Sequence, residues 1–348
     1  MALSAVGSQG YSTGGGSAND YIEKAYVAAF REGFEQAFQQ SESKLQPYFE
    51  QETQNEEYQY FDRIGKAEDM AEDTSRYGTN PNSEINHDRR RIGLKDYELG
   101  KYIDEKDLKR VITDPMNAYT QALLASGKRK IDDIIIDKYF GTAYTGKNGT
   151  TAVTFAVDDT DEDDSGIKVG AISAKDDIVT AGDYTVVAGN TEGFTIGADY
   201  GGVGSGLSLA KLRAARRTML KLHAIDQDET VNCFVTSQQI DDLLGITEVV
   251  SSDFAVRKAL VEGTVTTFMG FRFINCERLP LSGGAGGDER RCIVATDKAL
   301  KMSVGTGLKG DMWRDPSKKN IPYIYFKLCA DASRMWGEVA GEIRCNES

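Results

Sequence analysis

The sequence predicts an α+β fold, and three observations support this prediction. One long helical pattern lies in the first half of the chain, a polar two-stranded loop precedes it, and short helices and strands alternate from 208 to 300. Such alternation is typical of a compact α/β domain. The 348 residues are enough for two or three domains, or for one extended subunit with several parts.

Composition is that of an ordinary globular protein, with a strongly acidic balance. Hydrophobic residues make up 40%, charged residues 27%, and the formal net charge is −13. A protein that wraps nucleic acid by neutralising phosphates needs a surplus of Lys and Arg. The negative net charge therefore argues against that class. It is consistent with a surface that contacts DNA without binding it tightly.

The cysteines indicate neither a disulfide framework nor a zinc site, because there are five and no pair has C-x-x-C spacing. We expect reduced thiols, as in a cytoplasm. The first 20 residues lack the basic start and apolar core of a signal peptide. No apolar run is long enough to span a membrane, so we expect a protein made in a cytoplasm, with no membrane partner.

Residues 1–18 are small, polar and rich in glycine, which is typical of a flexible or extended arm. An amphipathic helix is predicted next, extending to about Leu45, before Pro47. Its apolar face carries Ile22, Tyr26, Phe30, Phe34 and Phe38. This aromatic stripe needs a partner surface, either in its own domain or on a neighbouring subunit, and the pattern leaves both open.

A long two-stranded loop follows the arm. Its strands are predicted at 58–64 and 89–103, and the polar segment between them has Gly78 and Asn80-Pro81 at its tip. An isolated hairpin of that length is marginal in water, so it must lie on another surface, as in an assembly subunit. A mobile surface loop is the alternative.

The central helix is predicted from Pro115 to Phe140, with Asp114 as its N-cap. Its apolar stripe consists of Met116, Tyr119, Leu123, Ile131 and Ile134. Gly141 is expected to end the helix. At 1.5 Å per residue the helix would be about 39 Å long, which suits a spine across a flat domain.

The chain changes character after this helix. Residues 142–207 contain short β segments broken by glycine and aspartate, which predicts a small β-rich insert. Ser208 is expected to cap a second amphipathic helix with a basic face. The basic residues are Lys211, Arg213, Arg216, Arg217 and Lys221. This face could touch nucleic acid or an acidic neighbour, or be solvated.

The remaining elements alternate between strand and helix. We predict a strand at 231–236, a short helix begun by Ser237 and ended by Gly245, a helix at 253–263, and strands at 270–280 and 292–300. The closing segment, 321–345, is predicted to be two long strands with a turn near Asp331.

No motif for catalysis or ion binding is complete. Residues 141–148 nearly match a phosphate-binding loop, but Asn148 replaces the Ser or Thr, and a helix stands where the motif needs a strand. The acidic run at 158–164 fits a calcium loop only in part, because Ile172 replaces the bidentate Glu. The two histidines lie in no catalytic motif. We therefore expect no enzyme activity, catalytic residue, cofactor or metal site.

The order of the elements resembles that of the major capsid protein of tailed bacteriophages, which has the Hong Kong ninety-seven type of shell fold. Local phrases look like that family too. They are YFDRIGKAEDM, DPMNAYTQALLASGKRKIDDIIIDKYFG, VTSQQIDDLL, ALVEGTVTTFMGFRFINCERLP and ADASRMWGEVAGEIRC. The resemblance covers nearly the whole chain except residues 142–207.

The resemblance implies a division of the chain. The parts are an N-terminal arm at 1–57, an extended loop over a neighbouring subunit at 58–104, a peripheral domain at 105–208 with spine helix 114–140 and insert 142–207, an axial domain at 209–309, and return strands of the peripheral domain at 310–348. The family offers no catalytic site. Its founding member cross-links subunits through a loop lysine, but the surroundings of Lys66 do not support that chemistry here.

The function implied is that of a structural protein that self-assembles, as pentamers and hexamers, into the icosahedral head of a tailed double-stranded DNA bacteriophage. The implied partners are many copies of itself, a separate scaffolding protein, a portal, a decoration protein, and packaged DNA bound without sequence specificity. The protein would be made in the bacterial cytoplasm and located in the virion. Inter-subunit contacts are expected at Tyr26, Phe30, Phe34, Phe38, Tyr77, Arg89, Arg90 and Arg91.

Two alternative functions remain open at this point. An encapsulin-like nanocompartment shell would share the fold and enclose enzymes, and particle size and cargo would separate the two. A phage tail or adhesion protein would instead use the β-rich insert to bind a ligand, and would form a small oligomer with a well-formed pocket.

Overall fold

The computed structural model describes most of the chain after its first 38 residues. The described residues are 39–67, 70, 72, 76, 78, 82, 84–103, 116–156, 166–174, 184–202, 205–245, 267–282 and 289–347. Most of the expected arm helix, the acidic run at 158–164 and the expected helix at 253–263 lie outside them. So do Asp114 and Pro115, at the expected start of the central helix.

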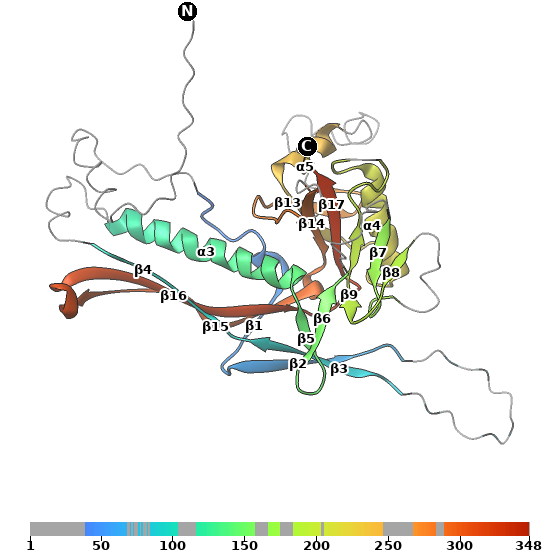
Figure 1. Cartoon of the computed structure of the whole chain (residues 1–348), viewed down its shortest axis with the longest axis horizontal. Helices are drawn as coiled ribbons and strands as arrows, with labels where there is room; N and C mark the ends of the chain where they lie inside the picture. The colour runs from blue at the N-terminus through green and yellow to red at the C-terminus, as the bar shows by residue number, and fades with distance from the viewer. Residues whose placement is uncertain are drawn as a thin grey trace, which may run out of the picture.

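A long helix over a four-stranded sheet forms the elongated part of the molecule (Figure 1). The helix is α3 (Met116–Phe140). The sheet has the order β1 (Glu50–Thr53), β15 (Leu300–Asp315), β16 (Ile321–Arg334) and β4 (Asp96–Tyr102). Ile324 and Phe326 of β16 pack against Leu123 of the helix. Gly127 permits this close packing, because a Cβ there would lie 2.6 Å from Leu308 Cδ1.

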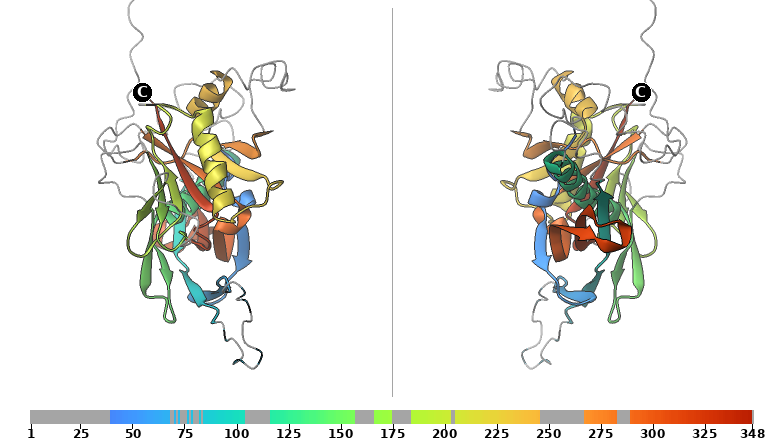
Figure 2. Two further views of the ribbon diagram at one scale, coloured as in Figure 1. Left: turned by 90° about the vertical axis from the view of Figure 1, so that its right-hand side faces the viewer. Right: turned by 90° about the vertical axis from the view of Figure 1, so that its left-hand side faces the viewer.

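An eight-stranded sheet forms the second part. Its order is β12 (Thr267–Phe268), β13 (Phe271–Asn275), β11 (Val231–Val235), β14 (Glu289–Ala295), β17 (Ala340–Asn346), β10 (Phe194–Ile196), β7 (Ile167–Gly170) and β8 (Thr185–Val187). Helix α4 (Leu209–Lys221) covers one face of it (Figure 2). The Ser208 hydroxyl accepts from the Lys211 N–H, which confirms the expected N-cap. The short helix α5 (Ser237–Gly245) is also confirmed.

A five-stranded sheet forms the base of the long loop. Its order is β2 (Tyr58–Ile64), β3 (His87–Gly93), β5 (Ala143–Thr145), β6 (Thr151–Phe155) and β9 (Thr191–Glu192). The strands β2 and β3 are antiparallel and lie along the lower edge of the molecule in Figure 1. Parts of the chain far apart in sequence therefore meet at this base.

The C-terminal turn of α3 connects the two larger parts. Tyr139 is fully buried, and its hydroxyl lies 3.1 Å from the Val294 carbonyl oxygen and 2.9 Å from that of Gly341, in two neighbouring strands of the eight-stranded sheet. Burial raises the pKa of this hydroxyl far above its usual range. The helix ends at Gly141 as expected, where a Cβ would lie 2.4 Å from the Asp137 carbonyl oxygen.

The prediction that the arm helix extends to Leu45 is wrong for its last residues, since 39–45 are not helical. This segment instead binds the spine helix through the buried Asp132. The carboxylate of Asp132 accepts the backbone N–H groups of Lys44, at 3.0 Å, and Leu45, at 3.1 Å, and also the Ser43 hydroxyl. A carboxylate with several donors fixes the chain in a non-helical conformation at this point.

The central helix and the first loop strand, 58–64, are confirmed. The prediction of one strand at 89–103 is wrong: β3 and β4 belong to different sheets. The chain crosses between the sheets at Leu94 and Lys95, where the Leu94 N–H donates to the Glu57 carbonyl and the Lys95 carbonyl accepts from Ala330.

The described strands within residues 142–207 are divided between two sheets. Strands β5, β6 and β9 join the loop base, whereas β7, β8 and β10 extend the eight-stranded sheet. The expected return strands divide in the same way, because β16 lies in the four-stranded sheet and β17 pairs with β14 and β10. The two closing strands are confirmed as β16 and β17, but the turn between them lies at 335–339, a few residues after the expected place near Asp331.

We expect Tyr139→Phe to lower the free energy of unfolding by about 1–3 kcal/mol, because two buried carbonyls lose a donor. Chemical denaturation of the unassembled subunit measures this. Tyr325→Phe is the matched control, since its hydroxyl bonds Glu98 at 3.0 Å on the exposed side of β16 and its loss should cost less than about 0.5 kcal/mol. Equal effects would contradict the connecting role of Tyr139.

Candidate functional site

The loop base brings together the basic residues that the sequence predicts as inter-subunit contacts. Strands β2 and β3 pair over their full length, from Tyr58 opposite Gly93 to Ile64 opposite His87. Side chains of successive strand residues point to opposite faces. The burial of Phe61 and Arg63 between exposed neighbours shows that this sheet has one outer and one inner face.

Tyrosines and arginines cover the outer face, here called the Tyr–Arg face. It consists of Tyr58, Tyr60, Arg89, Arg91 and Tyr144. Between 40% and 46% of each tyrosine is exposed. The Arg89 guanidinium lies over the Tyr60 ring at 5.5 Å and pairs with Asp62 at 3.0 Å. Tyr and Arg are the residue types enriched at the centres of protein interfaces, so this surface is suited to contact another chain.

Arg90 points to the inner face and is fully buried within the subunit. Its guanidinium pairs with Glu192, whose side chain is 1% exposed. Burial lowers the pKa of Arg90, and the Glu192 charge opposes this. A side chain with no accessible surface cannot contact a neighbour, so the expectation for Arg90 is corrected: alternation along β3 places it opposite to Arg89 and Arg91.

Glu192 is shared by a second buried arginine, at the end of β16. Arg334 Nε donates to Glu192 Oε1 at 2.8 Å, and neither side chain is more than 1% exposed. Arg334 Nη1 also donates to the carbonyls of Tyr139 and Gly141, the latter at 2.6 Å. These carbonyls end α3, where a helix leaves acceptors unpaired and carries partial negative charge. The junction of Arg90, Glu192 and Arg334 thus joins the loop base to the spine.

A second ion pair holds the outer end of the loop base. Arg63 donates to the Asp88 carboxylate and to the Met335 carbonyl, and it lies over the Trp336 ring at 5.0 Å. The Thr145 hydroxyl donates to the same carboxylate. Burial raises the pKa of Asp88, but the hydrogen bonds from Thr145 and Arg63 and the Arg63 charge outweigh it, so the pKa falls to about 2.

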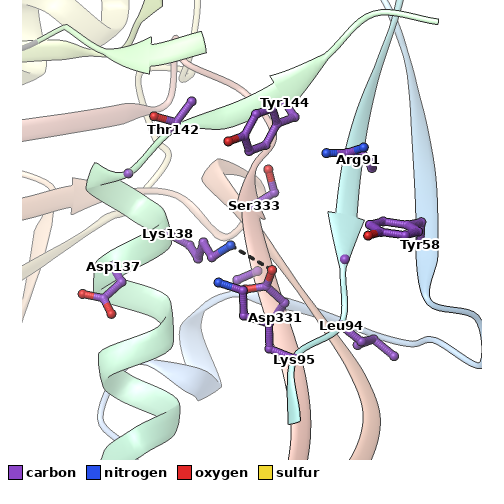
Figure 3. Close-up of a pocket in the computed structure, with 13 residues that line it drawn as sticks. Tyr58, Arg91, Leu94, Lys95, Asp137, Lys138, Thr142, Tyr144, Asp331 and Ser333 are labelled. Atoms are coloured by element: carbon purple, nitrogen blue, oxygen red, sulfur yellow. Dashed lines mark hydrogen bonds and ion pairs between the residues drawn. The ribbon is translucent and has the colours of Figure 1, made fainter. Parts of the chain in front are cut away.

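A groove of about 470 Å³ lies beside the Tyr–Arg face, between β3, β5, the end of α3 and β16 (Figure 3). Its charged lining residues are Arg91, Lys95, Asp137, Lys138 and Asp331. Lys138 Nζ pairs with Asp331 at 2.8 Å. The Arg91 guanidinium lies over the Tyr58 and Tyr144 rings, so this side chain belongs to both the face and the groove.

The other predicted contact residues lie outside the described part of the chain. They are Tyr26, Phe30, Phe34 and Phe38 of the arm and Tyr77 of the loop. Of the eight predicted residues, the structure therefore places Arg89 and Arg91 on one exposed face and Arg90 beneath it. No sequence pattern identified Glu192 or Arg334 as partners of Arg90, since each lies in an otherwise ordinary strand.

The basic face of α4 is smaller than predicted. Lys211 is fully buried, and its Nζ donates to the carbonyls of Ser205 at 2.6 Å, Gly206 at 2.9 Å and Arg344 at 2.9 Å. Three carbonyl acceptors compensate the buried ammonium. Arg213 and Arg217 remain exposed on this helix.

The near match to a phosphate-binding loop is a β-hairpin turn between β5 and β6, with Gly146 and Gly149 at positive φ. The described residues contain no group of three His, Cys, Asp or Glu side chains that could hold a metal ion. No helix in the described part combines the length and apolar character needed to cross a membrane.

Solved structures with a similar fold include phage capsids. The capsid of cyanophage Pam1 matches with a TM-score of 0.61 at 14% identity, covering 92% of this chain and 98% of that one. The capsid of cyanophage P-SCSP1u matches at 0.59 and 12%, covering 92% and 94%. The mature capsid of bacteriophage PhiM1 matches at 0.60 and 10%, covering 92% of each chain. At these identities the likeness defines the class of fold, that of a capsid subunit.

The sequence then places the chain in a family. The model of the family described as phage capsid protein matches residues 22–347, so the chain belongs to that family. No curated protein sequence matches it. The protein is thus a structural major capsid protein, many copies of which form the phage shell, and its place is the capsid of the virion.

We expect Glu192→Gln to destabilise the subunit by about 3–5 kcal/mol, because it leaves Arg90 and Arg334 as buried charges without a counter-charge. Urea denaturation of the unassembled subunit measures the loss. Asp62→Asn is the control: it breaks the exposed pair with Arg89, worth about 0–1 kcal/mol. A loss for Glu192→Gln no larger than for Asp62→Asn would show that the buried junction does not hold the base together.

The lowered pKa of Asp88 predicts that the free energy of unfolding depends on pH. Its pKa is lowered from 3.8 to about 2 in the fold, so its stabilisation is fully present above the unfolded value and is lost as pH falls through the folded value. We expect the difference in unfolding free energy between the natural chain and Asp88→Asn to be constant above about pH 5 and to shrink between about pH 4 and pH 2. A difference that does not change with pH would contradict this.

Proposed function

We propose that the protein builds the icosahedral head of a tailed double-stranded DNA bacteriophage, as pentamers and hexamers, and that its extended loop and N-terminal arm join the subunits. The observation that supports this best is the exposure of apolar side chains along the loop. Ile64 is 61% exposed, Met70 fully exposed and Ile85 43% exposed. Exposed apolar side chains of a mostly polar segment are stabilised when another surface covers them.

The Tyr–Arg face at the loop base supports the same proposal. It presents three half-exposed tyrosines beside two arginines, on a sheet whose position is fixed by buried ion pairs. A rigid aromatic surface loses little conformational entropy when it binds. We infer that Arg89 and Arg91 contact a neighbouring subunit, together with Tyr77 of the loop and the aromatic stripe of the arm, Tyr26, Phe30, Phe34 and Phe38.

We assign the parts of the fold to the axial and peripheral domains of a shell subunit. In this proposal the eight-stranded sheet with α4 and α5 is the axial domain around the fivefold and sixfold axes. The four-stranded sheet with α3 is the peripheral domain. In a shell built from both pentamers and hexamers, one surface must fit several lattice positions, and in this proposal the arm and loop are the parts that adjust.

The partners we propose beyond the shell itself are a separate scaffolding protein, a portal, a decoration protein and packaged double-stranded DNA. The net charge of −13 is consistent with a shell protein that does not bind DNA tightly. Synthesis in the bacterial cytoplasm agrees with the cysteines, which are all free thiols and, apart from Cys329, buried. The alternatives, a nanocompartment shell or a tail protein, receive no support from the family match.

We expect a subunit in which residues 65–86 are replaced by an Asn-Gly hairpin turn to fold but form no closed shell, because the surface that covers a neighbour is gone. Circular dichroism and thermal unfolding test the fold, and negative-stain electron microscopy tests assembly. The natural chain, expressed in parallel and with its neighbouring phage genes if needed, is the control. Normal shells from the shortened subunit would refute the role of the loop.

A further inference from the structure

The groove beside the Tyr–Arg face contains cations that the subunit does not neutralise. Of its two carboxylates, Asp331 is paired with Lys138, and Asp137 points away from Arg91 (Figure 3). Neither Arg91 nor Lys95 has a carboxylate or carbonyl partner for its side chain among the described residues. The groove therefore offers two positive charges to an occupant.

Arg91 is held in place before any occupant arrives. Its guanidinium carbon lies 5.2 Å from the Tyr58 ring centroid and 5.3 Å from that of Tyr144. Its aliphatic stem lies beneath Gly149, where a Cβ would come within 2.7 Å of Arg91 Cβ and 2.8 Å of Cδ. A side chain fixed on several sides loses little rotamer entropy on binding.

This arrangement matches one ligand chemistry. Rings against a guanidinium satisfy its faces by cation–π contact and leave the N–H groups at its edge as donors. Two parallel N–H groups of an arginine fit the two oxygens of a carboxylate, and such charge-assisted bonds are among the strongest in proteins. Lys95, which also lines the groove, adds a second positive charge.

We propose that Arg91 and Lys95 form a clamp for a carboxylate of a second copy of this chain. The inference rests on the proposed function, because it requires a neighbouring subunit at the loop base. The chain has 54 Asp and Glu against 41 Lys and Arg, so the surface of each copy offers an excess of carboxylates. The exposed tyrosines beside the clamp continue the same contact surface.

The first test is assembly of Arg91→Glu against Arg213→Glu. Arg213 is exposed on α4, far along the chain from the groove, and the two variants change the net charge equally. We expect Arg91→Glu to remain folded by circular dichroism and to reduce the yield of shells by about tenfold or more, since a repelled carboxylate costs at least about 1.4 kcal/mol per contact. Arg213→Glu should assemble as the natural chain does.

The second test identifies the occupant. Subunits carrying Arg91→Lys are prepared with natural and with heavy nitrogen, mixed, assembled and treated with a carbodiimide, which joins lysine amines to nearby carboxylates. Mass spectrometry should find links from position 91 or Lys95 to an Asp or Glu in peptides of mixed isotope composition. Links within one copy only, or no links at either position, would overturn the clamp.

Gly149→Ala tests the positioning of Arg91 without changing charge. The added methyl group displaces the arginine stem, and we expect shell yield and the mixed-isotope links to fall together. Gly189→Ala is the matched control, because Gly189 also has a positive φ, 92°, but nothing lies within 4 Å of a Cβ there. An equal loss in both variants would assign the effect to backbone strain and overturn the positioning argument.

The outcomes separate the clamp from the proposed function. If neither the natural chain nor Arg213→Glu forms shells, even with the neighbouring phage genes expressed, the proposed function fails and the clamp with it. If both form shells and Arg91→Glu does so with equal yield, the clamp alone is overturned. Loss of assembly confined to Arg91→Glu, with mixed-isotope links at the groove, supports both.

Discussion

The buried junction of Arg90, Glu192 and Arg334 is the interaction on which the arrangement of the loop base, the four-stranded sheet and the spine helix depends. Arg90 comes from strand β3 of the loop base and Arg334 from the end of strand β16. Glu192 lies between them without access to solvent. Arg334 also binds the last carbonyls of the spine helix. Charges taken out of water are costly unless each is paired, so the three elements that supply these charges are held in one relative position.

The orientation of the candidate contact surface follows from this junction. Residues alternate between faces along a strand, so a strand cannot shift by one residue without exchanging its faces. Because Arg90 is held inside, Arg89 and Arg91 must point outward, beside the tyrosines of β2 and β5. The internal ion pair thus determines which side chains the loop base presents to a neighbour.

Charged residues are arranged differently in the interior of the subunit and on its surface. Paired charges inside the subunit, such as Arg291 with the buried Glu342, specify how strands meet, whereas the excess of acidic residues is left to the surface. In a closed shell identical copies face one another, so an acidic surface needs a limited number of unneutralised cations at the contacts. Arg91 and Lys95 are two cations of that kind in the described part of the chain.

The sequence by itself determined the spine helix, the capped helix α4, the short helix α5, the first loop strand and the family, because these depend on local periodicity, helix start and stop signals and the order of elements. It did not determine which strands pair: the crossing at Lys95, the division of residues 142–207 between two sheets, and the place of β17 were decided by tertiary structure. Nor could it distinguish Arg89, Arg90 and Arg91, three adjacent residues of one type. Only the position of Glu192, about a hundred residues away, decides which arginine is buried, because pairing between distant strands leaves no periodic signal in the sequence.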